Sequence, residues 1–177
     1  MLQVRFHGRG GQGVVTAAEL LALAAFLDGR HAQAFPSFGS ERTGAPVMAF
    51  CRVGDAPIRT REPIVAPDAL VIQDPTLLHV AGVFAGFTDG PVLVNTSREL
   101  ALPCGRLVAV PATELARTHL GRPLPGAPML GALAAVTGLV PLGALEGAIR
   151  ERFAGAVAEG NVAAAAAAHA ALAAVSG

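Results

Sequence analysis

Hydrophobic residues recur along the chain with two different periods, which together predict strands alternating with helices. Short segments that alternate or are continuously apolar predict strands. They lie at 2–6, 31–35, 46–53, 69–74, 91–97 and 105–110. Segments with apolar residues every three or four positions predict helices at 14–27 and 111–120. Segment 46–53 is expected to pair with 58–62 across the turn "GDAP", forming an antiparallel hairpin.

The last third of the chain is predicted to be helical. From Pro123 onward, apolar residues keep helical spacing through "MLGALAAVTG", "PLGALEGAIRERF" and the alanine-rich end, with Gly138 and either Gly155 or Gly160 between helices. No repeat or long linker divides residues 1–177, so we expect one domain whose helical part begins near residue 128. The predicted fold is α/β: a single three-layer α/β/α domain with a mostly parallel sheet, an antiparallel hairpin and helices on both faces.

A glycine-rich turn joins the first predicted strand to the first predicted helix. Gly8, Gly10 and Gly13 fit G-x-G-x-x-G, in the position that a dinucleotide-binding turn requires. Glycines permit positive φ and let backbone N–H groups approach an anion at the start of the helix. A tight turn that binds nothing would use the same residues. The pattern therefore leaves two interpretations open, an anion site and a purely structural turn.

Two nucleotide sites that use similar glycines are disfavoured. An NAD site needs an acidic residue at the end of the second strand, but the sequence there is "HAQAFPSF", and Asp28 precedes that strand. A P-loop needs Lys where Val14 stands. The turn thus has the glycines of an anion site without the residues that select a nucleotide.

The amino-acid composition limits the partners, cofactors and reactions that can be expected. Formal net charge is +0, which gives no electrostatic reason to expect nucleic acid as a partner. All 13 basic residues are Arg, which excludes Schiff-base chemistry on Lys. The two cysteines, Cys51 and Cys104, are too few for an iron–sulfur cluster, which takes about four thiolates. Free thiols favour a cytoplasmic setting, and the N-terminus leads into a strand without room for a signal peptide.

The chain is 53% hydrophobic, yet its longest apolar run does not predict a membrane span. This run, 161–175, is shorter than the roughly 20 residues that a membrane helix needs, and its alanines favour a packed helix. Because only 15% of residues are charged, part of the surface is expected to be covered by another protein.

Other polar residues have simpler explanations. Asp74, which precedes Pro75, and Asn95 end predicted strands, where helix capping is the favoured interpretation. His7 and Cys51 lie in or beside apolar strands and are expected to be structural. No carboxylate pair, nucleophile triad or metal-ligand cluster is recognisable, so we predict no catalytic and no metal-binding residue.

Three long segments carry a family resemblance. "HGRGGQGVVTAAELLA", "AQAFPSFGSERTGAPVMAFCRV" and "PDALVIQDPTLL" resemble the gamma subunit of the pyruvate:ferredoxin oxidoreductase family, the 2-oxoacid:ferredoxin oxidoreductases. "PMLGALAAVTGLV" and "LEGAIRERF" extend the similarity over nearly the whole chain. The opening "HGRGGQG" together with "PSFGSERTGAPV" resembles the types that act on pyruvate or branched-chain 2-oxoacids.

The resemblance implies one subunit of a cytoplasmic hetero-oligomeric enzyme. The complex would convert a 2-oxoacid, most simply pyruvate, and coenzyme A into acyl-CoA, CO2 and reduced ferredoxin. Thiamine diphosphate, Mg²⁺ and iron–sulfur clusters would lie on alpha, beta and delta-type partners. This chain would bind no cofactor alone, but would help to bind coenzyme A at a subunit interface and to assemble the complex.

The same resemblance implies a set of site residues. The turn and the loop after the second strand would hold the phosphates of coenzyme A, through Gly8, Arg9, Gly10, Gly11, Gln12, Gly13, Ser37, Phe38 and Arg42. Because loops after successive parallel strands gather at one edge, Arg42 is expected near the turn. Arg9 would pair with a phosphate or a partner's carboxylate, and Phe38 would anchor an interface or stack on adenine.

Two other functions stay open. One is a free-standing oxidoreductase that binds NAD or FAD at the glycine turn, and the other is a purely structural subunit.

Overall fold

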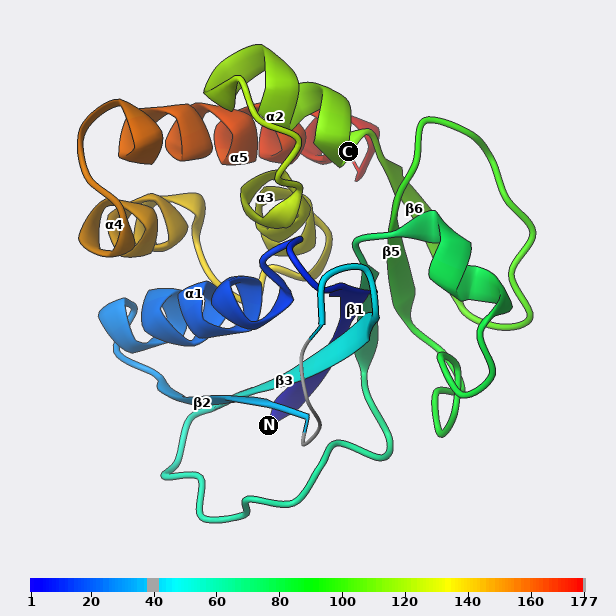
Figure 1. Ribbon diagram of the computed structural model, residues 1–177. Helices are drawn as coiled ribbons and strands as arrows, with labels where there is room; N and C mark the ends of the chain where they lie inside the picture. The colour runs from blue at the N-terminus through cyan, green and yellow to red at the C-terminus, as the bar shows by residue number, and fades with distance from the viewer. Residues whose placement is uncertain (38–41, 177) are drawn as a thin grey trace.

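The polypeptide is organised around a central sheet, shown in Figure 1. The structure, a computed structural model, describes residues 1–37 and 42–176. Within these residues six strands form one sheet in the order β2-β3-β1-β4-β5-β6. The strands are β1 (Leu2–Arg9), β2 (His31–Pro36), β3 (Pro46–Gly54), β4 (Ala69–Ile72), β5 (Pro91–Asn95) and β6 (Arg106–Val110). The α-helices are α1 (Val14–Leu27), α2 (Ala112–Leu120), α3 (Gly126–Thr137), α4 (Leu142–Arg152) and α5 (Gly155–Ser176), and η1 (Pro75–His79) is a 3-10 helix.

The sheet is mixed. β1, β4, β5 and β6 are parallel to one another, whereas β3 runs antiparallel to both β1 and β2. The predicted α/β fold is confirmed, but the hairpin joins β2 to β3, and the expected pairing of β3 with segment 58–62 is wrong. Cys51 of β3 lies opposite Val4 on one side and Ala34 on the other. Both edges of β3 are therefore occupied, and segment 58–62 lies outside the sheet.

The α-helices gather on one face of the sheet (Figure 1). α1 packs against β1, β2 and β3, and α3 contacts β5 and β6. On the opposite face, Leu70 and Ile72 of β4 pack with Leu77 of η1 and Phe87 of the following loop. The third layer is thus one 3-10 helix with loops rather than long helices. Three glycines with positive φ interrupt the connection from β4 to β5: Gly82, Gly86 and Gly90.

The helical C-terminal region predicted from the sequence is confirmed. The alanine-rich α5 packs closely on α3, where a Cβ on Gly131 would lie 2.0 Å from the carbonyl oxygen of Ala165. α3 ends at Gly138, whose φ of 63° is left-handed. In the described residues no helix has both the length and the apolar character to cross a membrane.

The chain segments that follow the neighbouring strands β1 and β4 lead to opposite faces of the sheet. Both β1 and β2 run antiparallel to β3, so the loops that follow β1, β2 and β4 leave the same edge of the sheet. The chain after β1 enters α1 on one face, and the chain after β4 enters η1 on the other (Figure 1). Ligands of open α/β sheets bind at such a switch point. The glycine turn and residues 73–76 occupy it.

Candidate functional site

The glycine turn is joined to the loop between β2 and β3 by backbone contacts. The N–H of Gly10 donates to the carbonyl of Ala45 (2.8 Å), and the N–H of Gly44 donates to the carbonyl of Gly10 (3.1 Å). A Cβ on Gly10 would lie 2.0 Å from the carbonyl oxygen of Arg42. Gly10 therefore permits the close approach of two loops, and the backbone of Arg42 lies beside the turn as expected.

The other side of the turn leads to the N-terminus of α1. Gly11 and Gly13 have φ values of 93° and 71°, and a Cβ on either would meet no atom within 4 Å. α1 begins after Gly13 with neither a side-chain cap nor an acidic residue in its first turn. The first N–H groups of a helix lack intrahelical acceptors and carry partial positive charge. This end of α1 can therefore receive an anion without displacing a carboxylate.

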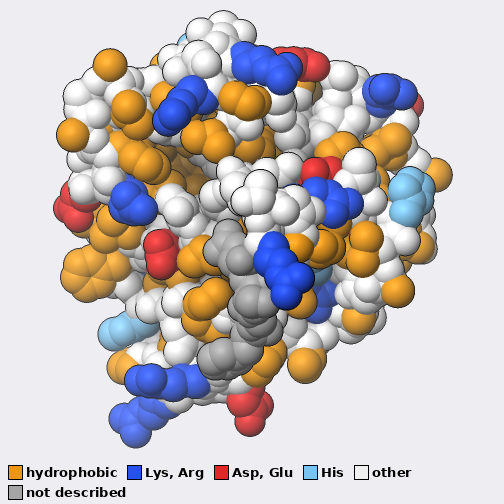
Figure 2. Space-filling view, in the orientation of Figure 1, with side chains coloured by type: hydrophobic (Ala, Val, Ile, Leu, Met, Phe, Trp, Pro, Cys, Tyr) orange, Lys and Arg blue, Asp and Glu red, His pale blue; other side chains and the backbone are white. Residues whose placement is uncertain are grey.

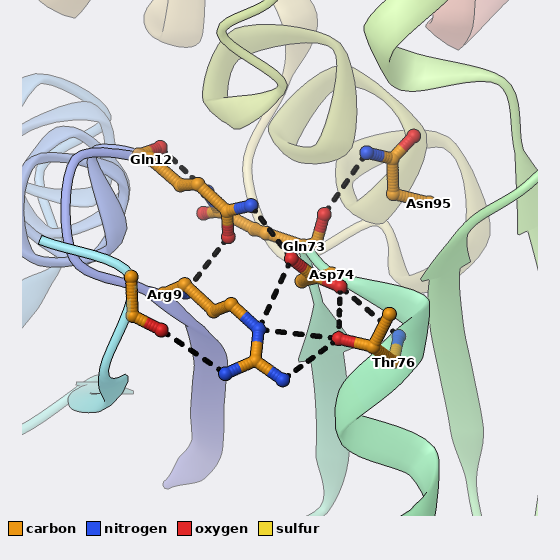
Figure 3. Close-up of polar contacts among 7 residues, drawn as sticks. Arg9, Gln12, Gln73, Asp74, Thr76 and Asn95 are labelled. Carbon is orange, nitrogen blue, oxygen red and sulfur yellow. Dashed lines mark hydrogen bonds and ion pairs between the residues drawn. The ribbon is translucent and has the colours of Figure 1, made fainter.

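Arg9 turns toward the connection after β4 (Figure 3). Its Nε and Nη2 donate to Thr76 Oγ1 at 3.1 and 2.9 Å, and its Nη1 donates to the carbonyl of Gly44 at 3.0 Å. Arg9 Nε also lies 3.5 Å from Asp74 Oδ2. Arg9, for which the sequence suggested a phosphate or a partner's carboxylate, thus has a carboxylate of its own chain beside it.

Gln12 points in the same direction (Figure 3). Its Nε2 donates to Asp74 Oδ2 at 2.9 Å, and its Oε1 accepts from the N–H of Arg9 at 2.7 Å. The backbone carbonyl of Gln12 accepts from Gln73 Nε2 at 2.8 Å. The polar groups of Gln12 therefore fix the shape of the turn from within.

Asp74 connects the turn to η1. The N–H and Oγ1 of Thr76 donate to Asp74 Oδ1 at 3.0 and 2.6 Å, which confirms the predicted helix cap. Burial alone would raise the pKa of Asp74, but the hydrogen bonds from Thr76 and Gln12 and the positive charge of Arg9 outweigh it, and the pKa lies below its usual value. The carboxylate therefore stays ionised at neutral pH and compensates the charge of Arg9.

Asn95 extends this network to α2. Its Oδ1 accepts from the N–H of Thr113 at 3.1 Å, and its Nδ2 donates to the carbonyl of Gln73 at 2.9 Å. Within the described residues no helix lies between β5 and β6, so Asn95 is not an N-cap as predicted; it instead binds the first turn of α2, whose N-cap is Pro111 and which follows the neighbouring strand β6. Gln73 is almost fully buried, and its Oε1 has no hydrogen-bond partner within residues 1–37 and 42–176. Gln73 was not among the predicted site residues, because its only signal in the sequence is a polar residue at the end of an apolar strand.

The second candidate loop is described in part. Ser37 follows β2, and its N–H donates to the carbonyl of Met48 at 2.9 Å. Arg42 is exposed, with its backbone against Gly10. Phe38 lies outside the described residues, so its predicted role is not addressed by the structure. The structure thus brings Arg42 to the glycine turn and places Ser37 at the end of β2.

His7 and Cys51 are buried in the sheet, as expected for structural residues. His7 Nε2 accepts from Arg5 Nε at 3.0 Å, and burial together with the positive charge of Arg5 lowers the pKa of His7 to about 3. Burial raises the pKa of Cys51 to about 12. Both side chains are therefore neutral at physiological pH. Across the described ranges, no group of three or more His, Cys, Asp or Glu residues is placed to hold a metal ion.

The chain is similar to one enzyme family over nearly its whole length. The family described as pyruvate ferredoxin/flavodoxin oxidoreductase matches residues 3–171. Pyruvate synthase subunit PorC of Methanothermobacter marburgensis is 50% identical over 166 residues, which cover 93% of this chain and 94% of the relative. The common gamma subunit of the pyruvate/ketoisovalerate oxidoreductases of Thermococcus kodakarensis is 49% identical over 173 residues, with 93% and 94% covered.

Solved structures agree with this assignment. Pyruvate oxidoreductase subunit PORC from Thermotoga maritima superposes with a TM-score of 0.85 at 40% identity, covering 96% of this chain and 95% of its own. A 2-oxoglutarate:ferredoxin oxidoreductase from Magnetococcus marinus shares the fold, with a TM-score of 0.78 at 16% identity over 98% of this chain and 31% of its own. The chain therefore belongs to the pyruvate ferredoxin/flavodoxin oxidoreductase family and is a gamma-type subunit of it.

Proposed function

We propose that this gamma-type subunit binds the phosphates of coenzyme A at the start of α1, within a pyruvate:ferredoxin oxidoreductase complex. The observation that carries the proposal is the first turn of α1, which has no side-chain cap and no acidic residue. Gly11 and Gly13 in front of it are exposed and leave open space around their Cα atoms. Phosphate oxygens can therefore approach the backbone N–H groups without meeting a side chain.

The complex would catalyse the oxidative decarboxylation of pyruvate or a closely related 2-oxoacid. Pyruvate and coenzyme A give acetyl-CoA and CO2, and the electrons released reduce ferredoxin. Thiamine diphosphate, Mg²⁺ and iron–sulfur clusters on alpha, beta and delta-type subunits supply the bond-breaking and electron-transfer chemistry. By holding the phosphates, this chain restricts the position of the thiol relative to those subunits.

The residues of the turn then have separate roles. Gly8 and Gly10 allow close packing, since a Cβ on Gly8 would lie 2.4 Å from Val14 Cγ2. Arg9 and Gln12 hold the turn in shape through Asp74. The exposed Arg42 beside Gly10 supplies a positive charge within reach of a bound phosphate.

A member of the wider group supports this class of ligand. The 2-oxoglutarate:ferredoxin oxidoreductase from Magnetococcus marinus was solved with 2-oxoglutarate, coenzyme A and succinyl-CoA bound.

Assembly is the second part of the proposed function. Phe26 and Leu27 stand next to each other at the end of α1 and are 69% and 41% exposed. Adjacent exposed apolar side chains of this size are typical of surfaces that contact another protein. Since Phe26 and Leu27 lie at the opposite end of α1 from the glycine turn, contact with a partner there leaves the anion site open.

Substitution of Gly13 by Asp or Asn tests the ligand role in the assembled complex. Asn adopts the left-handed conformation of Gly13, and Asp has nearly the same shape, so the two variants differ mainly in charge. We expect Gly13→Asp to raise the KM for coenzyme A about tenfold relative to Gly13→Asn, equivalent to about 1.4 kcal/mol. The ratio should fall at high salt, and the KM for pyruvate should not change.

The same variants distinguish the competing interpretations. Equal KM values for coenzyme A would refute phosphate binding at the turn. Loss of assembly in both variants would instead favour the purely structural subunit.

A further inference from the structure

A buried glutamine lies beside the glycine turn, directly after β4 (Figure 3). Gln73 is 1% exposed, and its Nε2 donates to the backbone carbonyl of Gln12 at 2.8 Å. Its Oε1 has no hydrogen-bond partner in residues 1–37 and 42–176. Among these residues, the bond to Gln12 is therefore the one hydrogen bond that determines which way the Gln73 carboxamide faces.

This bond also fixes the peptide that joins Gln12 to Gly13. In a trans peptide the carbonyl of one residue and the N–H of the next point in opposite directions. The carbonyl of Gln12 points to the buried Gln73, so the N–H of Gly13 points away from it. Within the part of the chain that the structure describes, this N–H donates to no acceptor. Gln73 therefore directs the N–H of the exposed Gly13 to the open side of the turn.

The two ends of this peptide are held in place by other contacts. The N–H of Gln12 donates to the carbonyl of Arg9 at 3.1 Å, and its side chain is bonded to the N–H of Arg9 and to Asp74. On the other side, the carbonyl of Gly13 accepts from the N–H of Ala17 at 2.9 Å. The peptide can therefore rotate between two fixed Cα atoms without displacing the turn or α1.

The surroundings leave room for a second orientation of the peptide. Rotation by half a turn changes ψ of Gln12 and φ of Gly13, and a glycine adopts φ of either sign. The present φ of Gly13 is 71°, and a Cβ on this residue would meet no atom within 4 Å. Gln12 and Gly13 line a pocket of about 140 Å³, and Figure 2 shows hydrophobic side chains around a recess near the middle of this face. The carbonyl of Gln12 would therefore turn into open space.

The two orientations satisfy the same number of hydrogen bonds. After rotation, the N–H of Gly13 points to Gln73, whose carboxamide inverts and accepts it at Oε1. Each orientation thus forms one bond to Gln73 and leaves one atom of its carboxamide unpaired, so the desolvation costs are similar. The first orientation presents an N–H at the start of α1, whereas the second presents a carbonyl oxygen. An anion is attracted by the first and repelled by the second.

We propose that Gln73 is a positioning residue that holds the Gln12–Gly13 peptide in either of two orientations, and that a phosphate group at the start of α1 selects the one with the Gly13 N–H outward. The inference rests on the proposed function and adds a conformational step to it. A ligand shifts such an equilibrium only by its different affinity for the two states. Here the difference arises because a donor replaces an acceptor at one point of the site.

Gln73→Glu makes the orientation of the peptide depend on pH. An ionised carboxylate only accepts, so it pairs with the N–H of Gly13, whereas a protonated carboxyl can donate to the Gln12 carbonyl as Gln73 does. Burial raises the pKa of a carboxyl, which brings its titration between about pH 5 and about pH 8. Over this range the titratable neighbours keep their charge, since Asp74 stays ionised and His7 stays neutral. Gln73→Leu is the matched control, because it has similar size but neither donates nor titrates.

The first measurement is the solvent-exchange rate of the Gly13 amide proton, by NMR on the full-length chain without ligand. An N–H bonded to a buried acceptor exchanges more slowly than one that faces water. We expect exchange in Gln73→Glu to be about tenfold slower than in Gln73→Leu at the upper end of the pH range. At the lower end the two rates should be similar.

The second measurement is made on the assembled complex. The KM for coenzyme A of Gln73→Glu, divided by that of Gln73→Leu at the same pH, should rise about fivefold over the same range. The KM for pyruvate and kcat should give ratios that do not change with pH. A residue that merely supports the fold would affect none of these pH profiles.

Gly13→Ala favours the second orientation while Gln73 is unchanged. Alanine disfavours a φ of 71°, whereas Asn tolerates it. We expect the KM for coenzyme A to be about fivefold higher in Gly13→Ala than in Gly13→Asn, and the amide proton of the alanine to be protected from exchange. Because Gly13 is exposed, this variant also decides the question if the buried carboxyl of Gln73→Glu prevents folding.

Three outcomes would overturn the proposal. The first is fast exchange of this amide in both Gln73→Glu and Gly13→Ala, which would show a single orientation. The second is a KM for coenzyme A that depends on pH in Gln73→Glu while exchange does not, which would assign the effect to charge alone. The third is slowed exchange with an unchanged KM, which would separate the peptide from ligand binding. The ratio between Gly13→Asp and Gly13→Asn judges the phosphate site separately, so its failure can be told apart from these.

Discussion

Two neighbouring glycines of the turn meet different physical requirements. Gly10 lacks a side chain because the carbonyl oxygen of Arg42 occupies the position where a Cβ would project. Gly11 has open space around it but a φ of 93°, a conformation that L-residues with side chains rarely adopt. A motif cannot separate these requirements, because the same letter satisfies both and Arg42 is distant in sequence.

Unfolding measurements on the full-length chain should separate these two glycines. Gly10→Ala forces the two loops apart and should cost about 1–3 kcal/mol of stability. Gly11→Ala introduces only the unfavourable φ and should cost about 1 kcal/mol. Urea denaturation of both variants gives the comparison. If Gly11→Ala were the more destabilised variant, the close contact between Gly10 and Arg42 would be in doubt.

At the scale of single elements, β1 carries a buried positive side chain that holds loops on the second face. Arg5 donates to the carbonyls of Ile64, Val83 and Ala85 at 3.3, 2.8 and 2.8 Å. Burial lowers the pKa of Arg5. Protonation of His7 would place a second positive charge against this guanidinium, whose Nε already donates to His7 Nε2. The strand is therefore compatible only with neutral His7.

This arrangement predicts a pH-dependent stability that depends on His7. The folded chain keeps His7 neutral down to about pH 3, whereas the unfolded chain binds a proton near pH 6.5. Stability from this group is therefore complete above pH 6.5 and is lost as pH falls toward 3, at about 1.4 kcal/mol per pH unit. Gln can accept the hydrogen bond from Arg5 without titrating, so His7→Gln should lack this loss.

The measurement is the difference in free energy of unfolding between the unmodified chain and His7→Gln from pH 7.5 to 4. Contributions from carboxylates occur in both proteins and cancel in the difference. A difference that stays constant with pH would show that His7 is accessible to protons in the folded state.

Local sequence patterns predicted the positions of most helices and strands, but not which strands pair with each other. The helix predicted at 14–27 matches α1, because the preceding glycines and the apolar spacing both act within that segment. The partner of β3 was predicted wrongly, because a short turn favours a local hairpin whereas β1 and β2 supply the two edges from elsewhere. Helices were expected on both faces of the sheet. The connection after β4, which contains three glycines with positive φ, forms only the short η1 on the second face.

At the scale of the whole molecule, the candidate site combines segments that are far apart in sequence. The turn and the cap Asp74 could be predicted, because each has a local signature. The bond from Thr113 to Asn95 could not, because it joins α2 to a different strand. The roles of Gln73 and Thr76 could not be predicted either, because they arise from the strand order. The inward orientation of Arg9 likewise depends on β1 lying next to β4.

The composition of the whole chain also limits the reactions that this subunit can catalyse by itself. With only two cysteines in its sequence, this chain cannot supply the four thiolates of a typical iron–sulfur cluster. We therefore expect the purified chain to show no pyruvate-dependent reduction of ferredoxin or of a dye.

Adding it to a complex that lacks this subunit should restore activity and saturate at a fixed ratio. The Gly13→Asp variant should saturate at the same ratio but require more coenzyme A, because it assembles while repelling the phosphates. Turnover by the chain alone, in proportion to its concentration, would contradict a role confined to binding and assembly.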